Sequence, residues 1–449
     1  MYNQLDTTTT IVAPATATGG AVVVVRLSGN NAIEIADKMF RGKHPLREAK
    51  GYTLHYGTIV DSENKTIDDV VVALFRAPHS YTGDDTVEIT LHGSEYITSE
   101  VLRLAIGYGA IMATPGEFTR RAFLAGKMDL SHAEAVADII ASDSQWSHKV
   151  ASTQMRGGYS EKLSELRGEL LKICSLLELE LDFSEEDVEF ADRTTLLHTL
   201  NNIDTQIESL TQSFALGNVL KNGVSVAIVG EPNVGKSTLL NALVEDDRAI
   251  VSDIAGTTRD TIEATTTIDG IRYRFIDTAG IHQTEDRLEQ LGIDRSCRAI
   301  ENANIILHIA SAKNPVFTPI PISSTQHYIR VINKIDTLIS SADIGINALQ
   351  ISAKKGIGVD ILRRAIRQTT DTAQLSAGSI VVSNMRHYAA LTSASEALAD
   401  ARRGMNTNTP SDLLSEDIRR IIHHLGEITG EITTTDILQT IFSKFCIGK

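Results

Sequence analysis

Cysteine is scarce in this sequence, which has only Cys174, Cys297 and Cys446 among its 449 residues. An odd number of widely spaced cysteines argues against a disulfide framework and favours a reducing compartment. Long apolar runs are also missing, because a membrane helix needs about eighteen apolar residues and the run Val22–Val25 is strand-length. Residues 1–10 carry neither the basic region nor the apolar core of an export signal. These absences predict a cytoplasmic protein without a membrane span.

Basic charge is in deficit as well, with 42 lysines and arginines against 57 acidic residues and a net charge of −15. Such a protein does not bind nucleic acid by bulk electrostatics, so any RNA contact needs a local basic patch or the surface of a partner. No solenoid-type repeat is visible. The length allows two to four domains, each with a core of its own.

A glycine turn follows an apolar stretch in the middle of the chain. Residues 226–238 read Val-Ala-Ile-Val-Gly-Glu-Pro-Asn-Val-Gly-Lys-Ser-Thr, which is GxxxxGK[ST] between a predicted strand and a predicted helix. Gly230 and Gly235 allow backbone N–H groups to surround phosphate oxygens, Lys236 reaches the outer phosphates, and the Ser237 hydroxyl suits Mg²⁺. The alternative is a glycine-containing turn with no nucleotide role. Taken alone, the motif therefore predicts a phosphate-binding P-loop, but the same pattern is known to give false positives.

Three later stretches strengthen the nucleotide prediction. Asp277-Thr278-Ala279-Gly280 ends an alternating strand, Asn333-Lys334-Ile335-Asp336 ends another, and Ser352-Ala353-Lys354 follows. The acceptor-only carboxylate of Asp336 matches the two donors on one edge of guanine, a pair that adenine lacks. The four motifs resemble those of the translation-factor and Ras-like GTPases. The residues expected around GTP are Gly230, Asn233, Val234, Gly235, Lys236, Ser237, Thr238, Ser252, Asp253, Ile254, Ala255, Gly256, Thr257, Thr258, Asp277, Thr278, Ala279, Gly280, Asn333, Lys334, Asp336, Ser352, Ala353 and Lys354.

The hydrolytic groups are less obvious. Many Ras-like proteins place a glutamine directly after the Asp-x-x-Gly turn, but Ile281 stands there and cannot position water. Glu289 is the candidate catalytic carboxylate, and an exposed helix charge is the alternative. Ser237 and Thr258 are expected to ligate Mg²⁺. The neutral oxygens of Asn233 and of residues 252–260 suit a monovalent cation of potassium size.

The chain is expected to be a multidomain α+β and α/β protein with a helical domain in two pieces. Residues 1–118 are strand-rich, residues 119–216 and 374–449 carry helical stripes, and residues 217–373 form the Ras-like P-loop module inserted between them. Leu163, Leu166, Leu170, Ile173 and Leu177 form one such stripe, and Ala133, Val136, Ala137 and Ile140 another. In the first segment, residues 81–88 and His92 cluster a turn, three carboxylates and a histidine, which also fits an ordinary charged hairpin.

Gly256-Thr257-Thr258-Arg259-Asp260, Leu288–Ile293, the domain order and the C-terminal Cys446-Ile447-Gly448-Lys449 together resemble one family. It is the family of tRNA uridine 5-carboxymethylaminomethyl modification GTPases, MnmE or TrmE, within the TrmE-Era-EngA-like translation-associated GTPases. The resemblance covers the whole chain. It departs from the family pattern at Thr18-Gly19-Gly20 and at His92-Gly93-Ser94, both in the first domain.

The resemblance implies a homodimer built through the N-terminal domains, which bind 5-formyl- or methylene-tetrahydrofolate. It implies catalysis by Glu289 and potassium-stimulated approach of the two GTPase domains. It also implies an FAD- and NADH-using partner, MnmG (GidA), and a tRNA wobble uridine as the substrate. The positions that match the family's folate site are Arg26, Glu88, Lys127 and Lys449, and those that match its potassium site are Asn233, Ser252, Ile254 and Thr257.

Two other functions stay open at this point. One is a ribosome-assembly GTPase without modification activity, which more usually adds a basic RNA-binding module. The other is a folate enzyme that the GTPase only regulates, but no complete acid/base set is visible outside the nucleotide domain. Cys446 is either a nucleophile or a small apolar residue before a C-terminal turn, because no base lies near it in the sequence.

Overall fold

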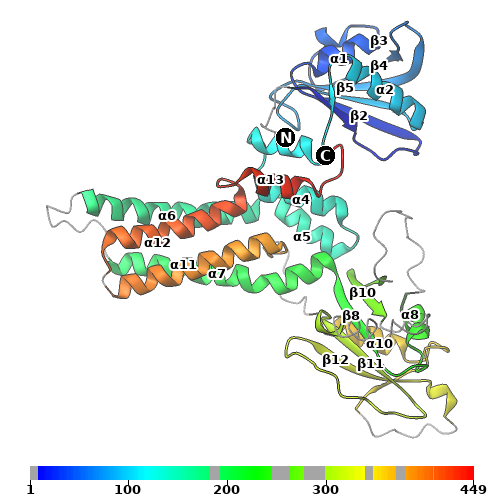
Figure 1. The fold of residues 1–449 in the computed structure, drawn as a ribbon, viewed down its shortest axis with the longest axis vertical. Coiled ribbons are helices and arrows are strands. Elements are labelled where there is room, and N and C mark those ends of the chain that lie inside the picture. Colours follow the sequence, from blue (N-terminus) through cyan, green and yellow to red (C-terminus); the bar gives the residue numbers. More distant parts are fainter. Residues whose placement is uncertain are drawn as a thin grey trace, which may run out of the picture. The chain divides into compact units, whose positions relative to one another are not determined.

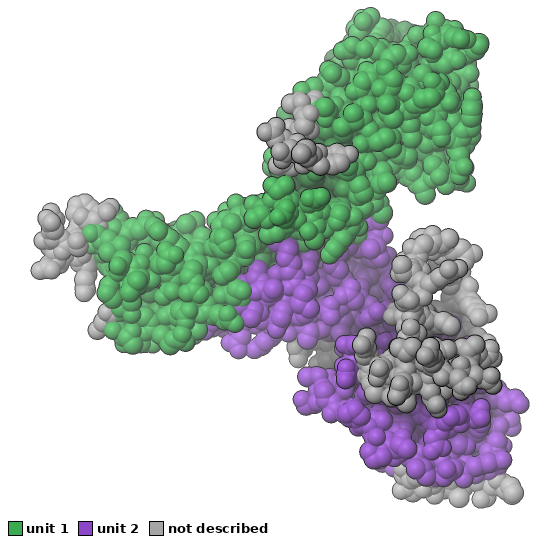
Figure 2. Space-filling view, in the orientation of Figure 1, with its two compact units in different colours: residues 1–137, 154–203, 393–449 green, residues 138–153, 204–392 purple. Residues whose placement is uncertain are grey.

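The computed structural model describes residues 9–182, 193–244, 263–277, 299–338, 347–370, 380–407 and 409–449. The chain divides into two compact units, coloured separately in Figure 2. The first contains residues 1–137, 154–203 and 393–449, and the second contains residues 138–153 and 204–392. No helix in the described part of the chain is long and apolar enough to cross a membrane.

A seven-stranded sheet forms the first part of the chain (Figure 1). Its strands are β1 (Ile11–Pro14), β2 (Val22–Ser28), β3 (Phe40–Gly42), β4 (Thr53–Val60), β5 (Thr66–Phe75), β6 (Thr86–His92) and β7 (Ile111–Met112). Their order is β3-β4-β5-β6-β2-β1-β7, and only the β1–β7 pair is parallel. The short 3₁₀ helix η1 (Leu46–Glu48) precedes β4.

One face of this sheet packs against helices, and the other face is partly exposed. Apolar side chains of alternate residues on β2, β5 and β6 form one core with α1 (Ala32–Met39) and α2 (Glu95–Gly107). On the opposite face, Leu54, Tyr56 and Val71 remain exposed, and the register places Leu54 beside Ala73 and Tyr56 beside Val71. Near β1 that same face is covered by Phe118 of α3 (Glu117–Leu124). The uncovered part is therefore an apolar patch on the β4–β5 side.

Two stretches of the chain, before and after the second sheet, are helical. They contain α4 (Leu130–Ala141), α5 (Gln145–Met155), α6 (Gly158–Asp182), α7 (Arg193–Asn222), α11 (Met385–Asn406), α12 (Ser411–Thr429) and α13 (Thr435–Phe442). The predicted stripe of α6, Leu163 to Leu177, is buried. In the first unit α6 packs along α12, and in the second Phe214 of α7 stacks on Tyr388 of α11. The stripe predicted for α4 is wrong at its end, because the helix buries Leu130, Ala133 and Ala135 and leaves Ile140 exposed.

The second unit contains a six-stranded sheet in the order β13-β12-β11-β8-β10-β9. Its strands are β8 (Val224–Val229), β9 (Glu263–Ile268), β10 (Ile271–Asp277), β11 (Ile305–Ser311), β12 (His327–Asn333) and β13 (Leu349–Gln350). All neighbours are parallel except β9 and β10, which form an antiparallel hairpin. Val226 and Ile228 pack with α8 (Lys236–Val244) and α10 (Val359–Gln368). Ala227 and Val229 pack into a second cluster on the other face, which is why β8 reads as an unbroken apolar run.

Candidate functional site

The glycine loop lies where the central strand β8 ends and α8 begins. Gly230 has φ +150°, and a Cβ placed there would lie 2.2 Å from the carbonyl oxygen of Ile309. Gly235 has φ +97°, and a Cβ there would lie 2.4 Å from Asn333 Nδ2. Both positions therefore require glycine, for backbone conformation and for space. The loop is a backbone cradle at the positive end of a helix, which is an anion-binding arrangement.

Lys236 closes this cradle from inside. Its ammonium donates to the carbonyl oxygens of Gly230 at 2.7 Å and of Glu231 at 2.9 Å, and the residue is 8% exposed. The loop therefore curls around the cation, which can hold an outer phosphate without a large movement. Ser237 and Thr238 follow in the first turn of α8 and are exposed, so their hydroxyls are accessible to a metal ion or a phosphate.

Asn333 joins the glycine loop to the segment that is expected to hold the base. Its Nδ2 donates to the carbonyl oxygen of Val234 at 2.9 Å, and its Oδ1 accepts from the N–H groups of Lys334 at 2.8 Å and Ala353 at 3.0 Å. The side chain is buried, with the residue only 1% exposed. One amide thus fixes three loops relative to one another, a role that the sequence alone did not reveal.

Asp336 and Ser352 form the polar end of the site. Ser352 Oγ donates to Asp336 Oδ1 at 2.6 Å, and this hydrogen bond lowers the pKa of the Asp336 carboxyl below its usual value, with Lys355 and Lys354 adding to the effect. The carboxylate is therefore ionised and purely an acceptor at neutral pH. Lys334 has φ +67° and donates from Nζ to the carbonyl oxygen of Asn233 at 2.5 Å, so its aliphatic stem spans the two loops.

A second group of predicted residues meets on the N-terminal sheet. Arg26 of β2 faces Glu88 of β6 in the register, and its Nε donates to Glu88 Oε1 at 2.8 Å. The same guanidinium lies 5.7 Å from the ring centre of Tyr81 and 5.5 Å from that of Phe118. Its Nη1 donates to the carbonyl oxygen of Gly448 at 3.2 Å. Two strands, a loop, α3 and the C-terminal tail therefore converge on one arginine.

The C-terminal tail reaches this arginine by close packing. Gly448 has φ +94°, and a Cβ there would lie 2.0 Å from the carbonyl oxygen of Pro14. Phe442 and Phe445 pack with Leu130 and Leu438 and anchor the segment that precedes it. Lys449 is thus held next to the sheet. Lys127 follows α3 and reaches the loop before β6, where its Nζ donates to the carbonyl oxygen of Pro78 at 2.5 Å.

Comparison with known proteins identifies the whole chain. A family model described as "GTP-binding protein TrmE N-terminus" matches residues 10–127, and one described as "MnmE helical domain" matches residues 130–446. A tRNA modification GTPase MnmE of Bacteroides fragilis is 48% identical over 98% of this chain and 99% of its own length. The chain belongs to the MnmE family. Proteins of the same name from Parabacteroides distasonis and Flavobacterium johnsoniae are 47% and 46% identical over 98% of this chain, and over 100% and 99% of their own lengths.

Membership of the MnmE family confirms several predictions. The fold class is as expected, with an N-terminal α+β domain, a discontinuous helical domain and an inserted Ras-like P-loop GTPase domain. The family is one of GTPases, as its members' names state. Of the cysteines in the described residues, Cys174 is buried and Cys446 is exposed, and both are free thiols.

Part of the predicted site lies outside the described residues. This holds for Ser252 to Thr258, for Thr278 to Gly280 and for Glu289, so the predicted catalytic carboxylate, the Thr258 ligand for Mg²⁺ and three of the four potassium ligands stay predictions. The backbone of Asp277 ends β10, as expected. The structure brings the other predicted nucleotide residues together around the glycine loop and the turn after β12.

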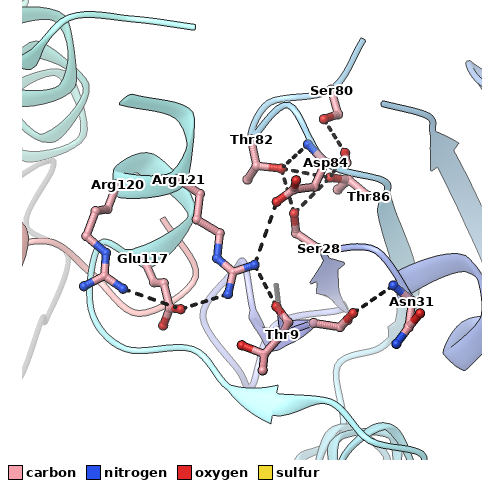
Figure 3. A network of polar contacts seen from close by, with 11 residues as sticks. Thr9, Ser28, Asn31, Ser80, Thr82, Asp84, Thr86, Glu117, Arg120 and Arg121 are labelled. Carbon is pink, nitrogen blue, oxygen red and sulfur yellow. Dashed lines mark hydrogen bonds and ion pairs between the residues drawn. The ribbon is translucent and has the colours of Figure 1, made fainter. Parts of the chain in front are cut away.

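Sequence reasoning missed a buried polar network beneath the loop before β6 (Figure 3). Arg121 of α3 donates to the carbonyl oxygen of Thr9 at 2.8 Å and pairs with Glu117 at 3.2 Å and Asp84 at 3.8 Å. Burial raises the pKa of Asp84, and the Arg121 charge opposes that shift. Thr82 lies in the same loop, and its Oγ1 is 2.7 Å from Ser28 Oγ.

This network fixes the loop that carries Tyr81, and Tyr81 lies against Arg26. The Tyr81 hydroxyl is 2.9 Å from Thr119 Oγ1, which ties the ring to α3, and burial raises its pKa. The only sequence signal was the i, i+4 spacing of Glu117 and Arg121, which indicates an ion pair on one helix but does not indicate that the pair is buried.

Proposed function

We propose that this protein hydrolyses GTP as part of the complex that installs the 5-carboxymethylaminomethyl or aminomethyl group on the wobble uridine of certain tRNAs. The observation that carries the proposal is the joint arrangement of Asn333, Asp336 and Ser352 beside the glycine loop, in a chain that matches MnmE proteins over 98% of its length. An ionised acceptor held at that place suits the donor edge of guanine.

Among the residues proposed for hydrolysis, the described ones at the glycine loop suit bound GTP and Mg²⁺. Lys236 and the loop N–H groups would bind the phosphates, and Ser237 together with Thr258 would hold Mg²⁺, which when bound neutralises charge on the phosphate oxygens. Glu289 orients the attacking water, and Asn233, Ser252, Ile254 and Thr257 supply neutral oxygens for K⁺. Ser237 and Asn233 are both exposed, which is compatible with these roles.

We further propose a folate site around Arg26 and Glu88. Glu88 Oε1 contacts both Nε and Nη2 of Arg26 at 2.8 Å, and the carboxylate is partly exposed, so its other oxygen can accept from a pterin's donor edge. Tyr81 and Phe118 offer flat apolar faces beside it. Lys127 and Lys449 supply positive charge for the glutamate tail of 5-formyl- or methylene-tetrahydrofolate. The donors and acceptors present therefore fit this ligand.

The apolar patch on the N-terminal sheet supports a homodimer. Leu54 is 73% exposed and Tyr56 is 72% exposed, which is unusual for two large neighbouring side chains on one sheet face. Leu54, Ala73, Glu88 and Arg26 are successive partners in the register, so a second copy on the patch would lie beside the folate site.

The remaining proposals concern partners and domain limits. The acidic composition suits a protein whose partner, the FAD-dependent MnmG (GidA) subunit, carries much of the tRNA. We also propose that the domain limits are residues 1–118 for the N-terminal domain, 119–216 and 374–449 for the helical domain, and 217–373 for the GTPase domain. The two matched family ranges meet between residues 127 and 130, slightly later than the first of these limits.

The test is mass spectrometry of tRNA nucleosides from cells whose only copy carries Glu289→Ala. Glu301→Ala, an exposed glutamate before β11, is the matched control. We expect the wobble modification to disappear with Glu289→Ala and to persist with Glu301→Ala, while the purified variants bind GTP equally well. Persistence of the modification in both strains, with altered ribosome profiles, would instead favour the ribosome-assembly GTPase.

A further inference from the structure

Two adjacent histidines and a glutamate form a cluster near the end of α12 (Figure 1). His423 and His424 lie one turn before Glu427, and one ligand atom of each residue lies within 4.8 Å of those of the other two. Among the described residues, this is the one group of three histidine, cysteine or carboxylate side chains with such a spacing. The cluster shares no residue with the proposed nucleotide and folate sites, so neither of those ligands accounts for it.

The helix itself brings the three side chains together. Successive residues of an α-helix are about 100° apart around its axis, so Glu427, four residues after His423 and three after His424, lies between the two histidines. His424 Nδ1 is 3.1 Å from Glu427 Oε2, and His423 Nε2 is 3.7 Å from Glu427 Oε1. Each carboxylate oxygen therefore faces one imidazole nitrogen.

These separations suit an ion of the size of zinc. Imidazole nitrogens and carboxylate oxygens bind Zn²⁺ at about 2.0 to 2.2 Å, so two ligand atoms at tetrahedral angles lie about 3.3 to 3.5 Å apart. The observed 3.1 and 3.7 Å lie on either side of that range. A carboxylate has about four lone-pair positions, so an oxygen that already accepts a hydrogen bond can still contact a metal ion. Small rotations of the side chains are therefore enough to form the site.

The surroundings of the cluster favour a cation and hold the helix in place. The guanidinium groups of Arg419 and Arg420, one turn earlier, are paired with Glu178 and with Asp400 and Asp417. The carboxylate of the cluster lies in the last turn of α12, where the partial negative charge of the helix end attracts cations. α12 packs along α6, which fixes the backbone that carries the three side chains.

We propose that His423, His424 and Glu427 bind a divalent transition-metal ion such as Zn²⁺, with water completing its shell. Two imidazoles and one carboxylate are the protein ligands of open zinc sites. Mg²⁺ and Ca²⁺ prefer sites made of oxygen ligands, so they do not compete for this one. The bound ion joins residues of successive turns and clamps the end of α12, from which the chain continues through Gly430 to the C-terminal tail.

The test is calorimetric titration of the full-length protein with Zn²⁺ after saturation with GDP and Mg²⁺. His423→Gln, His424→Gln and Glu427→Gln each replace a metal ligand by an amide, which binds zinc poorly. His198→Gln, at an exposed position of α7 in the same compact unit, is the matched control. The zinc-free unfolding midpoint of each variant shows whether it is folded. His423 is the most exposed of the three, so its replacement disturbs the fold least.

We expect wild type and His198→Gln to bind one zinc ion that the three ligand variants bind at least about tenfold more weakly, because each variant has lost a protein ligand. Zinc bound elsewhere is common to all the proteins and does not affect the comparison. Equal zinc binding by wild type and the ligand variants would overturn the proposal, and so would displacement of this zinc ion by excess Mg²⁺. The proposed GTPase activity stands or falls separately, since GDP occupies its site throughout.

Discussion

Asp336→Asn is expected to change the base that the protein prefers. Asp336 presents an ionised carboxylate whose Oδ1 already accepts from Ser352 Oγ at 2.6 Å. Asparagine has nearly the same shape, and its amide oxygen can keep the Ser352 hydrogen bond. The second carboxylate oxygen is then replaced by an N–H donor. The site changes from two acceptors to one acceptor and one donor.

The size of the effect follows from those hydrogen bonds. A hydrogen bond to a charged group contributes about 1.5 to 3 kcal/mol, and a donor left facing guanine's amino group costs about 1 to 3 kcal/mol more. Together these losses correspond to a decrease in guanine nucleotide affinity of roughly sixtyfold to twenty-thousandfold. Xanthine has a carbonyl where guanine has the amino group, so xanthosine diphosphate is expected to gain affinity.

The assay is competitive binding of GDP and xanthosine diphosphate to wild type, to Asp336→Asn and to Asp360→Asn. Asp360 is an exposed residue of α10 and provides the same chemical change elsewhere in the domain. We expect the preference to shift toward the xanthine nucleotide in Asp336→Asn and to stay unchanged in Asp360→Asn. If Asp336→Asn binds GDP as tightly as wild type, the assignment of Asp336 to the base is wrong.

Three further predictions follow from other contacts. Asn333→Ala leaves buried backbone groups without partners and is expected to destabilise the GTPase domain by about 2 to 5 kcal/mol, seen as a lower unfolding midpoint of the nucleotide-free protein; an unchanged midpoint would contradict the bridging role. Glu88→Gln is expected to weaken 5-formyltetrahydrofolate binding about tenfold in calorimetry while GDP affinity stays unchanged, because the acceptor charge paired with Arg26 is lost. Despite burial, hydrogen bonds that include one from His132 lower the pKa of Asp129 to about 2, and Asp129 raises the pKa of His132. The stabilisation of the folded state by Asp129 is present above the residue's unfolded pKa near 3.8 and is lost as pH falls toward 2. The stabilisation by His132 is complete below its unfolded pKa of 6.5 and is lost as pH rises through its folded pKa. Asp129→Asn should therefore lower stability by about 1 to 2 kcal/mol at pH 5 and by less at pH 8, and equal losses at both pH values would refute the pair.

The sequence predicted best those features whose chemistry is local. The glycine loop is readable because a strand, a left-handed turn and a helix start must follow one another within a few residues, and the structure has Gly230, Gly235 and Lys236 in those roles. The leucine stripe of α6 is readable because its spacing fixes one buried face. The stripe of α4 was misjudged at Ile140 because periodicity does not show where a covering partner ends.

Features that depend on packing between distant segments could not be predicted in this way. Arg26 and Glu88 meet through a strand register that joins residues 62 positions apart. Arg121 reads as a surface cation in the sequence, yet it is buried because α3 packs beneath the loop of Asp84. The Asn333 bridge joins the ends of two strands that are 99 residues apart at its contact with Val234. Such contacts need the fold before they can be seen.

The most direct test of the account measures wobble-uridine modification in a reconstituted reaction containing tRNA, the MnmG partner, folate and the Asp336→Asn variant. We propose that hydrolysis of the nucleotide bound at Asp336 is coupled to the modification. We therefore expect modified uridine with xanthosine triphosphate and little or none with GTP, the reverse of the wild-type result. Equal modification with either nucleotide, or with none, would contradict that coupling.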